Sequence, residues 1–325
     1  MILVTGGAGY IGSNCTKLLL DRGEEVIILD NLSTGYKELI DPRAKFIEGD
    51  VGDKTLVNQI LDQGEVEGIF HFAGSLSVEE STRLPALYYR NNVLNSLNLV
   101  ECAIEFNVPH LIFSSTSAVY GDEVENPVRE SMTCSPESPY GKSKKAVEWI
   151  IQDLAKAHQD KISFALLRYF NVAGASEDGR LGQYKSQALL KVMSEVATGQ
   201  RKELEIYGDD YDTVDGTCVR DYIHVVDLCR AHLWAFDYLK KGGRSDFFNL
   251  GYGKGFSVKE MAVAYEKAID QPIPKKIGPR RPGDMVAVYS NTDKIEKSFE
   301  VDWKFNDVEK ICQSAFEFEK KFVLK

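Results

Sequence analysis

The sequence predicts an α/β protein in which helices cover both faces of a parallel sheet. The chain opens on a short apolar run, Ile2–Val4, which suits a buried parallel strand. Glycines follow at once at positions 6, 7, 9 and 12, and a helical pattern continues through residues 18–20. Short apolar runs and helical patterns then alternate through the first half of the chain. Such alternation is typical of a doubly wound parallel sheet.

The glycine turn after the first strand is the first candidate binding site. A strand, a glycine turn and a helix form a phosphate cradle, because glycines admit a pyrophosphate and the helix N-terminus supplies free N–H groups. A second apolar run, Glu25–Leu29, ends at Asp30, where a carboxylate binds the ribose hydroxyls of adenosine. Asn31, Leu32 and Ser33 follow, with no arginine nearby to accept a 2′-phosphate. The turn therefore predicts a Rossmann-type domain that binds NAD rather than NADP.

The remaining elements follow in chain order. Further apolar runs predict strands at Lys45–Ile47, Gly68–Phe72, His110–Ser114 and Ser163–Tyr169, with helical patterns at Thr55–Leu61, Asn92–Phe106 and Gly141–His158. After residue 170, Gly, Asp and Tyr become frequent, and helices are expected at Val226–Tyr238 and Ser257–Ile269. Ser257 and Glu260 can form a capping box for the second of these helices. We expect one domain over residues 1–170 and a smaller α/β lobe over 171–325, with an interleaved boundary.

Composition excludes several classes of protein. The 325 residues are 43% hydrophobic, enough for a sizeable core in one or two domains. The 39 basic and 49 acidic residues give a net charge of −10, which argues against a nucleic-acid partner. No apolar run is long enough to span a bilayer, so we expect no membrane partner. The six cysteines are scattered, and no basic segment precedes the first strand, so we expect a cytoplasmic location.

A tyrosine and a lysine form the candidate catalytic pair. Hydroxyl residues cluster at 114–117, and Tyr140-Gly-Lys-Ser-Lys144 then opens a helix. Tyr140 and Lys144 are four residues apart, so they share one helical face. The ammonium should lower the pKa of the tyrosine, which could then take a proton from a substrate hydroxyl. An ordinary surface pair is the alternative, but the glycine turn and the hydroxyl cluster favour catalysis.

Several motifs together resemble one branch of a known family. They are T-G-G-A-G-Y-I-G at 5–12, H-F-A-G at 71–74, Y-R-N-N-V at 89–93, F-S-S-T-S-A-V-Y-G-D at 113–122, Y-G-K-S-K at 140–144, R-Y-F-N-V-A-G at 168–174, C-V-R-D-Y-I-H-V at 218–225 and R-R-P-G-D at 280–284. The chain resembles the UDP-hexose 4-epimerases of the extended short-chain dehydrogenase/reductase family over nearly its whole length. The last two motifs are the specific ones, because glycine fingerprints occur in many dehydrogenases.

The resemblance implies which residues hold NAD. They are Gly6, Gly9, Tyr10, Ile11 and Gly12 at the pyrophosphate, Asp30, Asn31, Leu32, Ser33, Thr34 and Gly35 at the adenosine ribose, Asp50 and Val51 at the adenine, and Phe72, Ala73, Gly74, Ser75, Leu76, Asn91, Thr116, Tyr140, Lys144 and Phe170 along the rest of the cofactor. Simpler roles stay open for three of these sites. Asp30 could be a structural turn acid, Asp50 could cap the next helix, and Asn91 with Asn92 could start a helix.

The resemblance also implies a substrate site in the second lobe. Thr116 and Tyr140 would meet the sugar 4-hydroxyl, and the UDP group would be bound by Asn171, Gln187, Tyr207, Arg220, Arg281 and Asp284. Two phosphates in an acidic protein need local cations, and the planar fork of arginine suits phosphate. In isolation, either arginine could instead form a surface salt bridge. The five histidines show no metal-ligand spacing, so we expect no metal, and His71 is expected to pack in the core.

The sequence departs from the family pattern at a few of these positions. Leu76 stands where lysine is frequent, Gln187 stands in a segment that replaces the common UDP-binding stretch, and Thr116 stands where serine is commoner. At position 288, a tyrosine in the family narrows the pocket near the sugar C2 substituent. Val288 should leave room for an N-acetyl group, whereas a shift of one residue would put Tyr289 there instead.

The resemblance implies inversion at C4 of a UDP-hexose, which interconverts UDP-glucose and UDP-galactose through a 4-keto intermediate. The alternatives are another nucleotide-sugar epimerase, a dehydratase, or a non-catalytic NAD-sensing protein. A 4,6-dehydratase needs an acidic pair after Thr116, where Ser117 and Ala118 stand. An NAD-sensing protein usually lacks the Tyr or the Lys, and both are present. The family also pairs the helices at 92–106 and 141–158 across a homodimer, so we expect a dimer.

Overall fold

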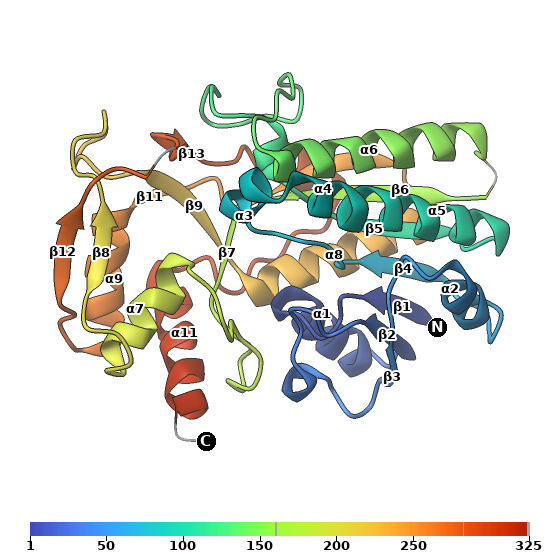
Figure 1. Cartoon of the computed structure of the whole chain (residues 1–325), viewed down its shortest axis with the longest axis horizontal. Helices are drawn as coiled ribbons and strands as arrows, with labels where there is room; N and C mark the ends of the chain where they lie inside the picture. Colours follow the sequence, from blue (N-terminus) through green and yellow to red (C-terminus); the bar gives the residue numbers. More distant parts are fainter. Residues whose placement is uncertain (160, 282, 324–325) are drawn as a thin grey trace.

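The computed structural model describes residues 1–159, 161–281 and 283–323. A large parallel sheet lies in the right half of the molecule as drawn in Figure 1. Its seven strands are β1 (Ile2–Thr5), β2 (Val26–Asp30), β3 (Lys45–Glu48), β4 (Gly68–His71), β5 (His110–Thr116), β6 (Ser163–Tyr169) and β10 (Asp246–Leu250). Their order is β10-β6-β5-β4-β1-β2-β3, and every neighbouring pair is parallel. The strand order reverses between β1 and β4, which is where ligands bind in such sheets. The predicted α/β fold class is confirmed.

Helices bury the sheet on both faces, which explains the continuous apolar runs of its strands. One face is covered by α1 (Tyr10–Asp21) and α8 (Val225–Lys240), and the other by α2 (Lys54–Leu61), α5 (Asn95–Glu105) and α6 (Pro139–Ala157). Successive strand residues point to opposite faces. Ile2 and Val4 therefore pack with α1 and α8, whereas Leu3 packs with the other three helices.

Short helices lie in the segments that follow β2, β4 and β5. They are η1 (Lys37–Leu39), α3 (Val78–Arg83), α4 (Pro85–Tyr88), a π-helical stretch η2 (Tyr89–Leu94) and η3 (Ser117–Val119). The helix expected from Asn92 thus begins regularly only at Asn95, after the π-helical stretch. The helix expected from Gly141 begins at Pro139, because the Ser138 hydroxyl accepts a hydrogen bond from the Gly141 N–H at 3.1 Å.

The second lobe lies at one end of the large sheet (Figure 1). Its strands are β7 (Asn171–Ala173), β9 (Val219–His224), β11 (Gly255–Ser257) and β13 (Ala287–Val288) in one small sheet, and β8 (Leu204–Tyr207) with β12 (Lys275–Gly278) in another. Its helices are α7 (Leu189–Ala197), α9 (Val258–Ile269), α10 (Asp293–Ser298) and α11 (Val308–Val323). The capping box of Ser257 and Glu260 is present at the start of α9. β10 and α8 follow residue 170 in the sequence, yet they pack on the large sheet.

Among the residues that the structure describes, no helix is both long enough and apolar enough to cross a bilayer.

Candidate active site at the carboxyl edge of the sheet

The glycine turn between β1 and α1 is closely packed and leaves the N-terminus of the helix without a side-chain cap. Gly6 has a φ of 70°, and a Cβ on it would lie 2.6 Å from the backbone N of Ala73. A Cβ on Gly12 would lie 2.2 Å from the carbonyl oxygen of Gly6. Gly9 precedes α1 and has no side chain to cap it, so the first N–H groups of the helix, from Tyr10 onward, remain available to an anion. The turn therefore fits a pyrophosphate.

Asp30 connects this turn to the segment after β2. Its two carboxylate oxygens accept hydrogen bonds from the N–H groups of Ala8 at 3.0 Å and Leu32 at 2.8 Å. Burial raises the pKa of Asp30, and the two N–H groups oppose this rise. Each oxygen keeps a lone pair, so the carboxylate can also accept hydrogen bonds from ribose hydroxyls. Gly35 lies beside it, and Ser33 and Thr34 are exposed.

Asp50 organises the next part of the edge. One of its oxygens accepts from the N–H of Gly52 at 2.7 Å and from Asn95 at 3.0 Å, and the other accepts from the Asn31 amide at 2.7 Å. The cap of α2 is instead Asp53, so the alternative that Asp50 caps this helix is wrong. Val51, the next residue, is buried.

Two neighbouring asparagines hold the loop after β4. Asn92 accepts a hydrogen bond from the Ser75 N–H at 2.7 Å, and it donates to the Ser75 carbonyl at 3.0 Å and to Ser143 at 2.9 Å. Asn91 donates to the Ser75 hydroxyl at 2.9 Å. The sequence analysis considered Asn92 a possible start of a helix. In the structure, the Asn92 side chain instead holds the loop at Phe72–Leu76 through its hydrogen bonds to Ser75. Leu76 itself is 71% exposed.

The predicted catalytic residues meet where β5 ends and α6 begins. Thr116 is the last residue of β5, and its side chain lies close to that of Tyr140 on the first turn of α6. Lys144, one turn further along, donates to the carbonyl oxygen of Ser114 at 2.9 Å. Its ammonium also lies 4.8 Å from the centre of the Phe113 ring.

The pKa values of this pair differ from the expectation. Burial raises the pKa of Tyr140, and the hydrogen bond from Thr116 opposes the rise only in part. The prediction that Lys144 lowers this pKa in the protein alone is therefore wrong. Burial lowers the pKa of Lys144 itself to about 8, because a low-dielectric surrounding disfavours the ammonium.

A buried histidine lies behind this pair. The two ring nitrogens of His71 lie 2.7 Å from the hydroxyl oxygens of Thr5 and Ser96. Burial, with a smaller effect from Lys144, lowers the pKa of His71 to about 3, so the ring is neutral. Among residues 1–159, 161–281 and 283–323, no cluster of three or more His, Cys, Asp or Glu side chains is arranged to hold a metal ion.

Four of the predicted UDP-binding residues lie together in the second lobe. Asp284 lies 3.6 Å from the Arg220 guanidinium and accepts a hydrogen bond from Arg281 at 3.0 Å. The guanidinium of Arg281 lies over the Tyr207 ring at 4.7 Å. The cluster thus combines two cations, an anion and an exposed aromatic ring. Arginine forks and an aromatic face are groups that bind phosphates and a base.

The other two predicted UDP-binding residues lie apart from these contacts. Gln187 is exposed just before α7, where its side-chain oxygen is 3.5 Å from Arg201. Asn171 is exposed at the start of β7 and pairs in register with Tyr222.

Val288 packs in a small apolar cluster at the site. It is buried with Phe170, Val119 and neighbouring residues, and it pairs in register with Arg220 on β9. Tyr289 lies on the other side of the strand, because a Cβ on Gly255 would lie 3.1 Å from its ring. Val288 is therefore the residue that faces Phe170, the last residue predicted to line the cofactor.

A buried ion pair between Glu148 and Arg168, which the sequence analysis did not identify, connects α6 to the large sheet. Glu148 accepts two hydrogen bonds from Arg168 on β6 and one from Ser115, the neighbour of Thr116 on β5. Burial raises the pKa of Glu148, but the bonds from Arg168 outweigh it and hold the pKa below its ordinary value. The spacing of Glu148, four residues after Lys144 on one helical face, is the signal that could have identified it.

Comparison with known proteins gives a family. The profile of the NAD dependent epimerase/dehydratase family matches residues 2–251. The UDP-glucose 4-epimerase of Lacticaseibacillus casei is 42% identical over 319 residues, which cover 97% of this chain and 95% of that protein.

Solved structures show the same relationship. A UDP-glucose-4-epimerase from Stenotrophomonas maltophila, with bound NAD and formylated UDP-arabinopyranose, has a TM-score of 0.96 at 33% identity, covering 99% of this chain and 98% of that one. The UDP-Glc/GlcNAc 4-epimerase of Campylobacter jejuni has a TM-score of 0.86 at 43% identity, covering 98% of this chain and 99% of that one.

Proposed function

The chain belongs to the NAD dependent epimerase/dehydratase family, and from this premise we propose that it is an NAD-dependent UDP-hexose 4-epimerase. It interconverts UDP-glucose and UDP-galactose through a 4-keto intermediate. The observation that carries the proposal is the placement of Tyr140 beside Thr116 at the carboxyl edge of the sheet, with Lys144 one helical turn away. This edge also carries the glycine turn and Asp30, which fit a dinucleotide.

Tyr140 acts as the general base, and Thr116 orients the sugar. The phenol removes the proton from the 4-hydroxyl and later returns one to the 4-keto oxygen. NAD, when bound, supplies hydride acceptance and donation at C4. Because burial raises the pKa of Tyr140, the phenolate needs positive charge nearby, and the buried Lys144 lies one turn away on the same face of the helix. The bond from Lys144 to the Ser114 carbonyl keeps that ammonium in a fixed position.

The second lobe holds the UDP group. Arg220 and Arg281 both contact Asp284, so a diphosphate can replace part of this pairing by accepting from the two guanidinium groups. Asp284 is then available for the uridine ribose, and Tyr207 for the uracil. We assign NAD binding to residues 1–170 and UDP-sugar binding chiefly to residues 171–325.

A homodimer formed through α5 and α6 is part of the proposal. Part of the apolar surface of these helices is used inside the subunit, since Val100 and Val147 are buried in the core. Other apolar side chains remain exposed beside them, including Leu94 at 57% and Trp149 at 56%. Light scattering at micromolar concentration should give twice the mass of the chain, and Trp149→Glu should give the monomer. A wild-type monomer would contradict the dimer.

Product analysis tests the proposed activity directly. The purified protein is incubated with UDP-galactose, UDP-glucose and their N-acetyl forms, and the sugars are then separated and identified. We expect UDP-galactose to yield UDP-glucose and UDP-glucose to yield UDP-galactose, with no net oxidation of the sugar. Recovery of unchanged substrate in every incubation would contradict the proposal, and loss of water from the sugar would indicate a dehydratase.

A further inference from the structure

The loop between β7 and α7 forms a compact unit, residues 174–185, which we call the strap. Ser176 holds it together from inside. Its N–H donates to the carbonyl of Leu181 at 2.8 Å, and its hydroxyl accepts from the N–H groups of Arg180 at 3.1 Å and Leu181 at 2.9 Å. These hydrogen bonds hold the strap in a compact conformation.

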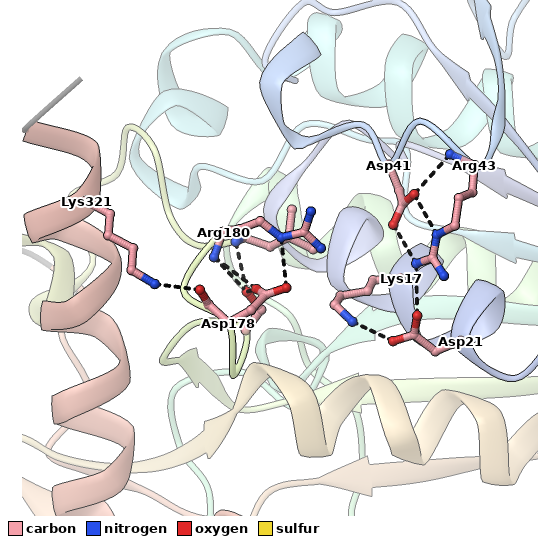
Figure 2. Close-up of polar contacts among 9 residues, drawn as sticks. Lys17, Asp21, Asp41, Arg43, Asp178, Arg180 and Lys321 are labelled. Atoms are coloured by element: carbon pink, nitrogen blue, oxygen red, sulfur yellow. Dashed lines mark hydrogen bonds and ion pairs between the residues drawn. The ribbon is translucent and has the colours of Figure 1, made fainter.

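One side of the strap is fixed to the C-terminal helix α11. The Ala175 N–H donates to the Ser314 hydroxyl at 3.2 Å, and Lys321 donates to the Asp178 carbonyl at 2.6 Å (Figure 2). Between these bonds the strap lies directly on Phe318, since a Cβ on Gly182 would come within 2.5 Å of that ring. The strap is therefore anchored on the second lobe.

The other side of the strap reaches the cofactor domain. Tyr10, at the start of α1, donates from its hydroxyl to the Gly174 carbonyl at 2.6 Å. Near the far end, the ring of Tyr184 stacks on Tyr36 with centroids 4.7 Å apart and planes 27° apart. Tyr184 also packs edge-on against Phe322 of α11 at 4.5 Å. An aromatic chain thus runs from α11 to Tyr36.

Tyr36 directly follows the segment, residues 30–35, that we assign to the adenosine ribose. Its N–H donates to the carbonyl of Ala8 in the glycine turn at 3.0 Å. The preceding residue, Gly35, approaches the Asp30 carboxylate so closely that a Cβ there would lie 2.9 Å from Oδ1. The stack on Tyr184 therefore holds the residues that cover Asp30.

Charge adds to this contact between the lobes. Arg180 of the strap lies between Asp178 and the turn that carries Asp41 and Arg43 (Figure 2). Hydrogen bonds from Arg43 are the main cause that lowers the pKa of Asp41, and the positive charge of Arg180 contributes to the same shift. Arg180, which also pairs with Asp178 of the strap at 2.8 Å, thus carries a positive charge near Asp41 of the cofactor domain.

We propose that the strap, through the stack of Tyr184 on Tyr36, retains NAD between turnovers. This inference rests on the proposed function, in which the cofactor is reoxidised in place and has no need to leave. For the adenosine end to dissociate, the segment over Asp30 must move away, and the stack opposes that movement. An aromatic pair of this kind should slow release roughly three- to tenfold.

NAD release from the holoenzyme tests this inference. The protein is loaded with NAD, mixed with an excess of a fluorescent etheno-NAD, and the exchange rate is followed. Tyr184→Ala and Tyr36→Ala should each exchange roughly three- to tenfold faster than the wild type, since each removes one stacking ring. The double variant should exchange no faster than the faster single variant, because both changes break the same contact.

Matched variants separate retention from a general loss of packing. Tyr184→Phe keeps the ring and should exchange at the wild-type rate. Phe316→Ala removes a ring from α11, the helix that carries Phe322. Phe316 packs against Tyr265 and not against Tyr184, so NAD exchange in this variant should also stay at the wild-type rate. Wild-type exchange in both Tyr184→Ala and Tyr36→Ala would overturn the inference while leaving the proposed function intact. A wild-type protein that binds no NAD would overturn both.

Discussion

Glu148 and Arg168 form a two-pronged ion pair in which both side chains are at most 1% exposed, with hydrogen bonds of 2.9 and 2.6 Å. The pair joins α6, which carries Tyr140 and Lys144, to β6, the strand that pairs with β5 in the large sheet. Arg168 continues the network by donating to Tyr120 at 2.8 Å. The helix of the catalytic pair is therefore held in register with Thr116 by charge as well as by apolar packing.

Breaking this pair should destabilise the protein strongly. Glu148→Gln leaves the Arg168 guanidinium buried without its counter-charge, which typically costs about 3–5 kcal/mol. Urea unfolding of the purified proteins measures the loss. Glu101→Gln, which breaks an exposed pair with Lys54, should cost no more than about 1 kcal/mol. Equal stabilities for Glu148→Gln and the wild type would contradict this account of the pair.

Acid should destabilise the protein through buried neutral histidines. His71 has a pKa of about 3 in the folded protein, against about 6.5 when unfolded. Between these values the unfolded chain binds the additional proton, so stability is lost as the pH falls from about 6.5 towards 3. The free energy of unfolding should depend less steeply on pH in His71→Gln than in the wild type. Between pH 6 and 4, the slope should be smaller by about 1.4 kcal/mol per pH unit.

The control for this titration is a histidine on the surface. His158→Gln, which replaces an exposed histidine, is the matched control for the loss of one histidine. Urea unfolding at several pH values measures each slope. An identical slope for His71→Gln and the wild type would show that this ring does not contribute to acid unfolding.

Removing one arginine of the second lobe should weaken nucleotide binding. Arg220→Ala should raise the Kd for UDP by roughly 10- to 100-fold, the size expected for lost charge-assisted hydrogen bonds. Arg280→Ala is the matched control, because this neighbouring arginine pairs with Asp210 instead, and it should bind UDP as the wild type does. Calorimetry with UDP compares the three proteins. An unchanged Kd for Arg220→Ala would remove Arg220 from the phosphate site.

The size of residue 288 should decide whether N-acetylated sugars are accepted. The wild type should convert both UDP-glucose and UDP-N-acetylglucosamine, whereas Val288→Tyr should lose mainly the N-acetyl substrate, because the added ring fills space beside Phe170. Tyr289→Phe should keep the wild-type ratio, since Tyr289 faces Gly255. Turnover of the two substrates measures the ratio. No detectable N-acetyl activity in the wild type would contradict the assignment.

The sequence was most informative where local chemistry determines local structure. Short, continuous apolar runs predicted the parallel strands. Such runs are expected because each of these strands is buried on both faces. The capping box at Ser257 was predicted from two side chains three residues apart, and it is confirmed. The roles of the motif residues in binding stay predictions, although Arg220 and Arg281 do both contact Asp284.

Features that depend on distant contacts could not be predicted from the sequence. The stack of Tyr36 on Tyr184 joins two loops whose sequences give no sign of each other. The pKa of Tyr140 was predicted wrongly because burial, which the spacing of Tyr140 and Lys144 does not reveal, has the largest effect on it. Asn92 was similarly undervalued, since its partners Ser75 and Ser143 belong to other elements.

Turnover of Tyr140→Phe tests the central claim most directly. The variant and the wild type are compared for conversion of UDP-galactose to UDP-glucose, and NAD binding is measured in the same preparations. We predict that the variant binds NAD like the wild type while its turnover is lower by on the order of 10² or more, as expected for a lost acid–base group. Turnover near the wild-type rate would contradict the role of Tyr140 as the base.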